Sequence, residues 1–457
     1  MSVTDASPVE IATAASISAR KIAILPVDAR NHALTVIHQA LSDAKQEILL
    51  ANARDLDLAT ISAEEGTLSQ SVLKRLDLGR KGKWEDMLKG ILDVRGLDDP
   101  VGQITLKTKL DDGLELERVT APIGVLLIIF EARPEVIANI ASLAIKSGNA
   151  AILKGGKEST ESFVAISNVI SEALKQTEVP NASIQLVKTR DVIPQLLALD
   201  KYVDLVIPRG SNELVLYVKN NTKIPVLGHA DGLCSIYIHE DADKDLAVKV
   251  LMDAKVEYPA ACNAVETLLV HESVLTTILP SVAQALLEKG VSLRCDTESK
   301  AALSFCLDKT SATILQDATE SDYDTEFLDL ILAIKTIPGS TSSDAAVDFA
   351  AAHINAHSSK HTDAILTSNK DLARRFQNAV DSACVFWNTS TRMADGMRFG
   401  FGTEVGISTN KIHSRGPVGL EGLMIYKYYI NGSGQTADDY HGGPGGKQWK
   451  HEKMALR

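Results

Sequence analysis

The feature that most restricts the fold of this chain is an alternation of short apolar runs and amphipathic segments between residues 124 and 227. The apolar runs are typical of buried parallel strands, because such strands are covered on both faces. Helical spacing of apolar residues follows each run. The expected strands are residues 124–130, 150–153, 184–187 and 203–207, with Val226 and Leu227 continuing the series. This β–α repetition predicts a doubly wound α/β domain around a parallel sheet.

Other regions flank this alternation. Residues 1 to about 100 carry apolar side chains at intervals of three and four, which predicts helices. Residues 106–118 alternate polar and apolar side chains around an Asp-Asp-Gly turn, which predicts a β-hairpin. A second α/β region is expected over residues 228–412, with one more strand at 424–430. Residues 432–446 are rich in glycine and polar side chains, so we expect a loose surface segment there.

The charge and the length of the apolar runs exclude several classes of partner. The formal net charge is −12, whereas binding to nucleic acid or to an anionic membrane requires a basic face. The longest apolar stretch, Ala121 to Phe130, is half the length of about 20 residues that a membrane-spanning helix needs. No charged-then-apolar signal pattern opens the chain. We therefore expect no nucleic-acid partner, no membrane association and a cytoplasmic location.

The cysteines indicate a reactive thiol rather than a disulfide framework. There are five, and no two of them form a C-x-x-C pair, so neither a disulfide scaffold nor a zinc ribbon is indicated. Cys262 stands at a loop-to-strand junction between the two α/β regions, which suits a nucleophile in a cleft. A small buried core residue would give the same pattern. Cys234 begins an apolar run, and we expect it to be the more buried of the two.

Several common catalytic motifs are absent. The sequence has no G-x-G-x-x-G after the first expected strand, no G-x-x-x-x-G-K-[ST], no H-E-x-x-H and no G-x-S-x-G. A standard Rossmann cofactor site, a P-loop kinase and a serine hydrolase are therefore unsupported. His353, His357 and His361 are spaced at four, as metal ligands on one helix face would be. Ser358 and Ser359 indicate a turn instead, and we expect no metal site.

Two glycine-containing junctions follow expected strands, at the edge where open α/β sheets bind ligands. Lys154 ends the second strand and could reach a ribose hydroxyl or a phosphate, although a turn with a solvated lysine would look the same. Gly210 and Ser211 follow the fourth strand and open a helix, where backbone N–H groups favour an anion. Ser211 is also a good N-cap, which needs no ligand. Both junctions are candidate contacts for a cofactor.

Three loops in the last third of the sequence combine glycine, hydroxyl and basic residues. They are residues 388–392, 400–404 and 406–411. This composition suits the binding of an anion, and ordinary loops share it. From these loops and from the segment after the first strand, we expect substrate contacts by Arg133, Ser390, Thr391 and Arg392.

Six segments, taken in order, resemble the gamma-glutamyl phosphate reductases, a branch of the aldehyde dehydrogenase superfamily. They are Ile129-Phe-Glu-Ala-Arg-Pro-Glu135, Lys146-Ser-Gly-Asn-Ala150 with Leu153-Lys-Gly-Gly-Lys-Glu158, Val226-Leu-Gly-His-Ala-Asp-Gly-Leu-Cys234, Cys262-Asn-Ala-Val-Glu-Thr-Leu-Leu269, His357-Ser-Ser-Lys-His-Thr-Asp-Ala364 and Gly406-Ile-Ser-Thr-Asn-Lys-Ile-His-Ser-Arg-Gly-Pro-Val-Gly-Leu420. The resemblance extends from the N-terminal helices to Gly422.

The resemblance implies an aldehyde-dehydrogenase-like α/β fold of two doubly wound domains plus a small β flap for oligomerisation. The implied parts are N-terminal helices that pack on the cofactor domain (1–105), a flap (106–120 and 424–440), an NADPH-binding domain (121–227), a catalytic domain (228–412), a return segment (413–423) and a tail (441–457). Since the flap would bury its strand edge against another copy, a homo-oligomer is also implied.

The resemblance also implies roles for individual residues. Cys262 matches the superfamily nucleophile, and Lys154 matches the lysine that contacts the adenosine ribose. Gly210 and Ser211 match the segment near the cofactor phosphates. Glu326 matches the glutamate that holds the nicotinamide ribose, but the chain reads Glu-Phe-Leu-Asp-Leu where the superfamily pattern is Glu-x-Phe-Gly-Pro.

The implied reaction is the NADPH-dependent reduction of L-glutamyl 5-phosphate to L-glutamate 5-semialdehyde and phosphate through a Cys262 thioester, in proline biosynthesis. Hydrolytic aldehyde dehydrogenases use the glutamate of a Glu-Leu-Gly-Gly-Lys segment to activate water, and the matching residues 228–232 contain no glutamate. The alternatives are a hydrolytic NAD(P)-linked aldehyde dehydrogenase, a bifunctional enzyme that also makes the acyl phosphate, and a non-catalytic binding protein. A glutamate 5-kinase, which would supply the acyl phosphate, is a candidate partner.

Overall fold

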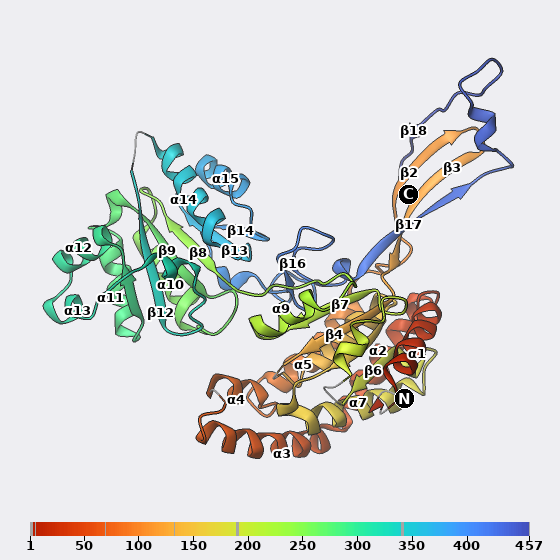
Figure 1. Cartoon of the computed structure of the whole chain (residues 1–457), viewed down its shortest axis with the longest axis horizontal. Coiled ribbons are helices and arrows are strands. Elements are labelled where there is room, and N and C mark those ends of the chain that lie inside the picture. Colours follow the sequence, from red (N-terminus) through yellow and green to blue (C-terminus); the bar gives the residue numbers. More distant parts are fainter. Residues whose placement is uncertain are drawn as a thin grey trace.

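The apolar runs of the sequence form the strands of two parallel sheets in the computed structural model of the chain. The structure describes residues 3–456 except 5, 69, 132, 189–191, 340 and 341. Figure 1 shows two α/β lobes, connected by loops, and a long β flap that extends away from both of them. The predicted fold class is therefore confirmed. No helix within the described residues is long and apolar enough to cross a membrane.

The first sheet has five parallel strands in the order β1-β6-β5-β4-β7. They are β1 (Val3–Thr4), β4 (Val125–Phe130), β5 (Ala150–Lys154), β6 (Ile184–Val187) and β7 (Leu205–Arg209). Successive side chains of β4 enter different cores, with Leu126 and Ile128 on one face and Leu127 and Ile129 on the other. Both faces of the sheet are buried, which explains why its strands are apolar throughout rather than alternating.

Helices cover both faces of this sheet. One face carries α1 (Pro8–Ile22), α8 (Ile193–Leu196) and α9 (Asn212–Asn220). The other carries α2 (Val27–Asp43), α5 (Lys83–Gly96), α6 (Val136–Lys146) and α7 (Thr160–Leu174). The remaining helices, α3 (Lys45–Glu64) and α4 (Gln70–Leu76), extend below the second lobe in Figure 1. Four of the N-terminal helices thus lie on one side of the sheet or beyond it.

One expected strand of the first sheet is wrong. Val226 and Leu227 do not form a strand, and Val226 makes only an isolated parallel bridge with Val206. The fifth strand is β1, which pairs with β6. Pro225 and Gly228 bound the short apolar run, and neither residue favours the extension of a strand.

The second sheet has seven parallel strands in the order β11-β10-β12-β9-β8-β13-β14. They are β8 (Cys234–Ile238), β9 (Val265–His271), β10 (Ser292–Cys295), β11 (Gln316–Asp317), β12 (Ile331–Ile337), β13 (Thr362–Leu366) and β14 (Cys384–Trp387). Its helices are α10 (Lys244–Val256), α11 (Leu279–Glu288), α12 (Thr297–Cys306), α13 (Lys309–Thr313), α14 (Ser343–His357) and α15 (Lys370–Ala379). Helices α10 and α11 pack on one face, and α14 and α15 pack on the other.

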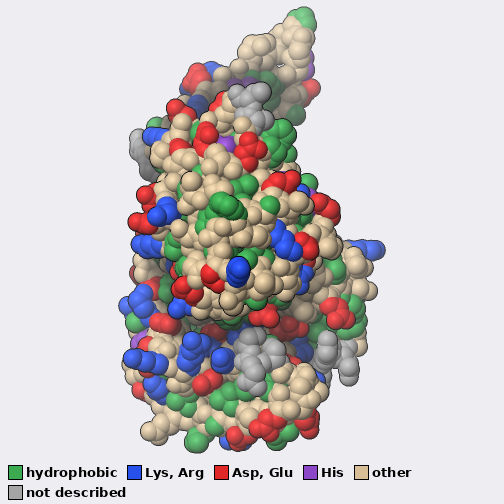
Figure 2. Space-filling view, turned by 90° about the vertical axis from the view of Figure 1, so that its left-hand side faces the viewer, with side chains coloured by type: hydrophobic (Ala, Val, Ile, Leu, Met, Phe, Trp, Pro, Cys, Tyr) green, Lys and Arg blue, Asp and Glu red, His purple; other side chains and the backbone are tan. Residues whose placement is uncertain are grey.

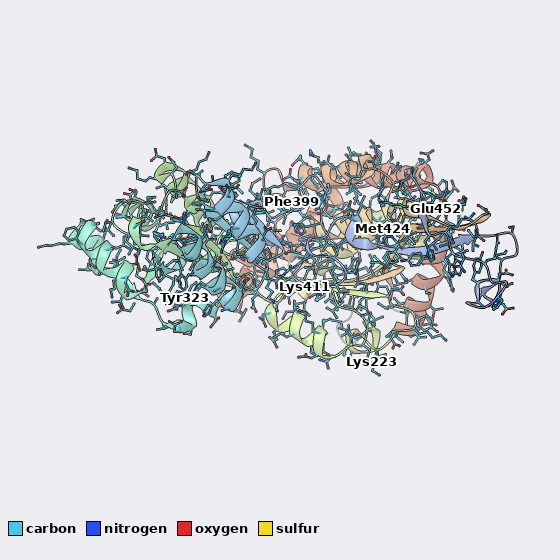
Figure 3. The ribbon with its side chains drawn as sticks, turned by 90° about the horizontal axis from the view of Figure 1, so that it is seen from above. Lys223, Tyr323, Phe399, Lys411, Met424 and Glu452 are labelled. Atoms are coloured by element: carbon cyan, nitrogen blue, oxygen red, sulfur yellow. The ribbon has the colours of Figure 1, made fainter. Side chains whose placement is uncertain are left out.

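The flap is a four-stranded antiparallel sheet in the order β17-β3-β2-β18. Its strands are β2 (Ile104–Asp111), β3 (Leu114–Pro122), β17 (Met424–Asn431) and β18 (Glu452–Lys453). In Figure 3, Met424 lies at the base of the flap and Glu452 lies farther out. The predicted pairing of the hairpin with residues 424–430 is present. Strand β18 lies in the segment expected to be a tail, and its two residues give no alternating pattern that could have revealed it. A separate two-stranded sheet joins β15 (Ile407–Ser408) to β16 (Gly416–Pro417).

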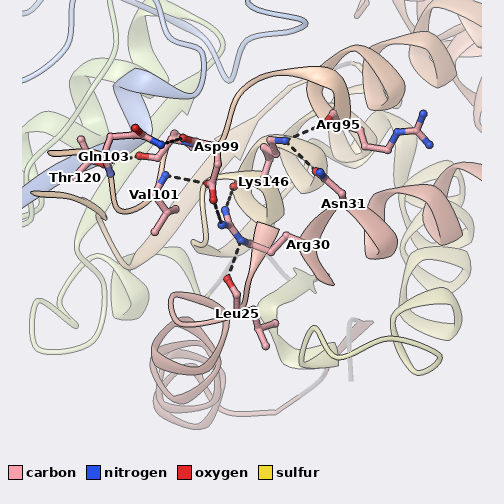
Figure 4. A network of polar contacts seen from close by, with 10 residues as sticks. Leu25, Arg30, Asn31, Arg95, Asp99, Val101, Gln103, Thr120 and Lys146 are labelled. Atoms are coloured by element: carbon pink, nitrogen blue, oxygen red, sulfur yellow. Dashed lines mark hydrogen bonds and ion pairs between the residues drawn. The ribbon is translucent and has the colours of Figure 1, made fainter. Parts of the chain in front are cut away.

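A buried network of charged side chains anchors the base of the flap to the first lobe (Figure 4). Arg30 of α2 is 1% exposed and forms an ion pair with Asp99 at 2.8 Å. It also donates to the carbonyl oxygens of Lys146 and Leu25. The ammonium group of Lys146 donates to Asn31 and to the carbonyl oxygen of Arg95, both at 2.9 Å. The buried cations of this structural network are therefore hydrogen-bonded, as stability requires.

Candidate active site

The region between the lobes lies at the carboxyl ends of strands of the first sheet and at the amino ends of strands of the second. In the first sheet, Lys154 is the last residue of β5, and Ser211 follows the carboxyl end of β7. Cys262 and His361 lie just before the amino ends of β9 and β13 in the second. The electrostatic interaction of Arg209, the last residue of β7, with Cys262 shows that the two edges lie close together. Figure 3 shows Phe399 and Lys411, from the C-terminal loops, in this middle region.

Cys262 lies beside two histidines. The Cys262 sulfur and one ring nitrogen from each of His229 and His361 all lie within 4.8 Å of one another. The ring centroids of the two histidines are 4.9 Å apart, with the planes at 80°. Nδ1 of His229 donates to the carbonyl oxygen of Ile407 at 3.0 Å, and Nδ1 of His361 is hydrogen-bonded to Thr362 Oγ1 at 2.9 Å. These bonds leave Nε2 of each ring as the nitrogen that can face the thiol.

The electrostatics of this cluster favour a thiolate. Burial acts to raise the pKa of Cys262, but the neighbouring His361 and His229 outweigh it and hold the pKa well below its usual value. Burial acts to lower the pKa of His229, but the charge and hydrogen bond of Cys262 raise it to about 9. A thiolate paired with an imidazolium is the form of cysteine that acts as a nucleophile. The three atoms could also surround a metal ion, but that ion would occupy the sulfur lone pairs that the nucleophile needs.

The remaining cysteines do not share this environment. Cys234 is fully buried, as expected, and burial raises its pKa well above the usual value. Burial also raises the pKa of Cys295 to about 12 and that of Cys384 to about 11. Cys306 lies on the surface of α12. Cys262 is therefore the best candidate nucleophile, as the sequence predicts.

The turn that carries Cys262 is held from several sides. Arg75 of α4 donates to Tyr258 Oη and, at 2.9 Å, to the carbonyl oxygen of Ala260. On another side, Arg392 donates to the side-chain oxygen of Asn263. A Cβ on Gly232 would lie 2.1 Å from the Cys262 carbonyl oxygen, so only glycine allows this approach. Contacts from distant parts of the chain thus fix the nucleophile turn.

Glu326 lies in the same region. Its Oε1 accepts from the backbone N–H of Gly232 at 2.9 Å. Burial raises the pKa of Glu326 to about 7, the Gly232 hydrogen bond opposes this shift, and the charge of Cys262 supports it. The structure therefore brings Glu326 to the nucleophile even though the residues that follow it depart from the superfamily pattern.

The expected cofactor contacts gather at the carboxyl edge of the first sheet. Lys154 is 7% exposed, and its ammonium group donates to the carbonyl oxygen of Gly155. Ser211 caps α9, and its hydroxyl accepts from Leu214 N at 3.4 Å. The backbone N–H of Ser211 donates to the Glu131 carboxylate at 3.0 Å. The N–H group at this helix start thus donates to an anionic group, which fits the binding of a cofactor phosphate.

The four expected substrate residues divide into two groups. Ser390 and Thr391 are buried, and Ser390 Oγ accepts from Arg392 N at 3.2 Å, so both help to form the turn that carries Arg392. Arg392 lies next to the nucleophile turn, with its guanidinium 5.6 Å from the centre of the Tyr258 ring. Arg133 lines a pocket on another side of Tyr258.

His229 and His361 are the site residues that the sequence reasoning missed. His229 is the histidine of the 228–232 segment, and its presence there is the signal that could reveal it. His361 is spaced at four from His357, so the sequence groups it with His353 and His357 instead of with Cys262. The indicated turn is present, since α14 ends at His357 and His361 precedes β13. The rings of His353 and His357 contact each other with their centroids 4.4 Å apart, and His357 contacts Asp324 at 2.9 Å, so neither belongs to the group around Cys262.

Comparison with known proteins identifies the class to which this site belongs. The model of the aldehyde dehydrogenase family matches residues 2–302, and the chain belongs to that family, which uses NAD(P) cofactors. A Schizosaccharomyces pombe protein described as "Probable gamma-glutamyl phosphate reductase" is 55% identical over 432 residues, 94% of each chain. The chain is a member of the gamma-glutamyl phosphate reductases, oxidoreductases of proline biosynthesis.

Solved structures agree with this assignment. The gamma-glutamyl phosphate reductase of Thermotoga maritima is 37% identical and superposes with a TM-score of 0.85, covering 94% of this chain and 100% of that one. The Saccharomyces cerevisiae enzyme is 42% identical over 95% of this chain and 100% of that one, with a TM-score of 0.52. The more similar sequence thus superposes less well over the whole chain.

Proposed function

We propose that the chain reduces L-glutamyl 5-phosphate to L-glutamate 5-semialdehyde and inorganic phosphate, with NADPH as reductant and a thioester on Cys262 as intermediate. The observation that carries this proposal is the cluster of Cys262, His229 and His361, in which the sulfur and one ring nitrogen from each histidine lie within 4.8 Å of one another. In this position the thiol pKa falls well below its usual value. A thiolate at neutral pH is the form that attacks an acyl phosphate.

The chain's own residues account for the acyl transfer. The Cys262 thiolate attacks the acyl carbon, the C–O bond to the phosphate breaks, and inorganic phosphate leaves with the electron pair of that bond. The cofactor supplies a hydride to the acyl carbon when it is bound. The tetrahedral adduct then expels Cys262 as a thiolate, which the His229 imidazolium stabilises as a leaving group. The aldehyde is released and the thiolate is regenerated.

The proposed cofactor contacts lie at the carboxyl edge of the first sheet. Lys154 at the end of β5 would contact the adenosine ribose, and Gly210 with Ser211 would contact the phosphates at the start of α9. A bound phosphate would replace the Glu131 carboxylate at Ser211 N. Glu326, close to Cys262, would hold the nicotinamide ribose.

A hydrolytic aldehyde dehydrogenase is the second candidate, and one observation favours it. Glu326 has a pKa of about 7 and lies near Cys262, which are the properties of a general base that could activate water against a thioester. Against it, Glu326 Oε1 is already bonded to Gly232 N. In addition, the 228–232 segment presents His229, with a pKa of about 9, where hydrolytic relatives have a glutamate.

We also propose that the flap joins copies of the chain into a homo-oligomer. Exposed apolar side chains gather on its strands: Ile104, Leu106, Ile425, Tyr426, Tyr428, Tyr429 and Ile430. An extended sheet with such a surface is typical of a protein interface. Sedimentation should show a defined oligomer, and residues 425–430 changed to Thr or Lys should yield monomers. A glutamate 5-kinase remains a candidate partner that would supply the short-lived acyl phosphate.

The test of the proposed reaction is its reverse. NADPH formation is measured from glutamate 5-semialdehyde and NADP⁺, with and without inorganic phosphate. Strict dependence on phosphate is the expected result, since the thioester must be released to an acyl phosphate. Equal turnover without phosphate, with glutamate as product, would establish the hydrolytic candidate instead.

A further inference from the structure

A basic pocket lies beside the nucleophile turn. It has a volume of about 200 Å³ and is lined by five cationic side chains, from Lys74, Arg75, Arg80, Lys83 and Arg133. Glu135 is the only carboxylate among its lining residues, which also include Tyr258, four residues before Cys262. In Figure 2, Lys and Arg side chains gather in the lower part of the molecule, directly below a hollow in its surface.

The charges of this basic pocket are only partly matched. Lys83 forms an ion pair with Glu135 at 3.1 Å, and Arg75 is used in holding Tyr258 and Ala260. Lys74, Arg80 and Arg133 have no carboxylate within ion-pair distance among the residues that the structure describes. Three unmatched cations around one cavity create a positive potential that favours an anion.

The pocket is close to the reacting sulfur. Arg75 holds the carbonyl of Ala260, two residues before Cys262. The charges of Arg133 and Cys262 both act on the Arg209 guanidinium. The pocket also differs from the cofactor contacts, because Lys154 ends β5, Ser211 caps α9, and neither residue lines the pocket. An anion in this pocket would therefore lie at the side of the nucleophile turn that the cofactor contacts leave free.

We propose that this basic pocket binds the phosphoryl group of the acyl phosphate while Cys262 attacks it, and the inorganic phosphate that then leaves. The α4–α5 region of the N-terminal helices thus contributes directly to substrate selection. This inference rests on the proposed reaction. The shared chemistry is a phosphate dianion, which the 2′-phosphate of the cofactor could also provide, so the experiment must separate the two sources.

The first arm of the experiment compares Arg80→Gln with Lys81→Gln in the reverse reaction. Both residues are exposed neighbours before α5, but Lys81 does not line the basic pocket. We expect Arg80→Gln to raise KM for inorganic phosphate about tenfold, since a charge-assisted hydrogen bond is lost. KM for the semialdehyde and for NADP⁺ should stay unchanged, and Lys81→Gln should change none of the three. A rise in KM for NADP⁺ instead would overturn the proposal in favour of a cofactor-phosphate site.

The second arm measures the binding of inorganic phosphate by calorimetry, without turnover. We expect weaker affinity in Arg80→Gln than in Lys81→Gln and wild type. If wild type shows no phosphate-dependent turnover, the proposed reaction fails, yet the affinity difference would still support an anion site here. Equal phosphate affinity in wild type and in the double variant Lys74→Gln, Arg80→Gln would overturn the pocket itself.

Discussion

The structural network around Arg30 and the region between the lobes both gather charged side chains, but the charges are matched differently in the two places. In the network, each nitrogen of the Arg30 guanidinium meets an acceptor, and Lys146 makes two hydrogen bonds of 2.9 Å. Between the lobes, the Cys262 thiolate depends on two histidines, and several pocket cations have no carboxylate partner among the described residues. The matched charges suit stability, whereas the unmatched charges suit a ligand or a reaction.

This contrast separates structural from functional residues without reference to sequence similarity. A matched cluster gains nothing from a ligand, since its hydrogen-bonding groups are already used. Unmatched charges make the folded chain less stable while the site is empty. Binding of a complementary anion or electrophile restores that stability. Variants of the structural network should therefore alter unfolding, and variants of the inter-lobe region should alter catalysis.

The largest effect is expected for Cys262→Ser. A serine hydroxyl has no thiolate form, so kcat should fall by about 10⁴-fold while the melting temperature stays close to that of wild type. The rate of NADPH oxidation with acyl phosphate checks this, with cofactor affinity measured alongside. Cys306→Ser, on the surface of α12, is the matched control and should retain full activity. Substantial activity in Cys262→Ser would rule out the thioester.

The next largest effect is expected for Arg30→Met. Removing this cation leaves Asp99 without its 2.8 Å partner and the Lys146 carbonyl without its donor. The loss of one member of a buried ion pair typically costs about 3–5 kcal/mol of unfolding free energy. Urea unfolding of the first lobe measures this loss, and KM for phosphate should not change at temperatures where the variant is folded. A normal stability with an altered KM would reverse the comparison.

Most of the fold was predictable because buried parallel strands produce a pattern that is local in sequence. The runs 124–130 and 150–153 coincide closely with β4 and β5. Strand β1 was missed because two residues carry no periodicity, and its place beside β6 depends on a contact between residues far apart in sequence. Strand β18 was missed for the same reason.

The site was less predictable than the fold because its chemistry depends on residues that the fold brings together from distant parts of the sequence. Cys262 is a candidate from its place at a loop-to-strand junction and from the resemblance, but nothing near it in sequence shows that ring nitrogens of His229 and His361 lie within 4.8 Å of its sulfur. The basic pocket likewise joins α4, the loop after β4 and the turn before β9. Isolated basic residues on a predicted helix look like an ordinary solvated face until the fold brings them together.

A smaller effect is expected for His229→Asn on the reactivity of Cys262. The wild-type thiol has a lowered pKa, so its alkylation by iodoacetamide should stay fast below the pH at which an ordinary thiol becomes protonated. Loss of His229 raises the thiol pKa, while His361 still supports the thiolate. The rate at pH 6.5 should therefore fall about tenfold for each unit of the rise, and the profile should move to higher pH.

The control for this prediction is His357→Asn. His357 lies at the end of α14 and contacts Asp324, away from the nucleophile, so its loss should not move the alkylation profile. An unchanged profile in His229→Asn would mean that His361 alone sets the thiol pKa. In that case, the role of His229 in stabilising the leaving thiolate would have to be withdrawn.

The smallest effect is expected for Arg375→Gln, which tests whether burial is the property that makes the Arg30 network important. Arg375 pairs with Asp348 at 2.6 Å and with Asp344 at 3.3 Å, so its charge is also matched, but all three side chains are well exposed. Water and salt screen such pairs, so the loss of unfolding free energy should be far smaller than that of Arg30→Met. The same urea experiment on the second lobe measures it. If the loss equalled that of Arg30→Met, charge matching alone would explain both results, and burial would no longer distinguish the structural network from the surface.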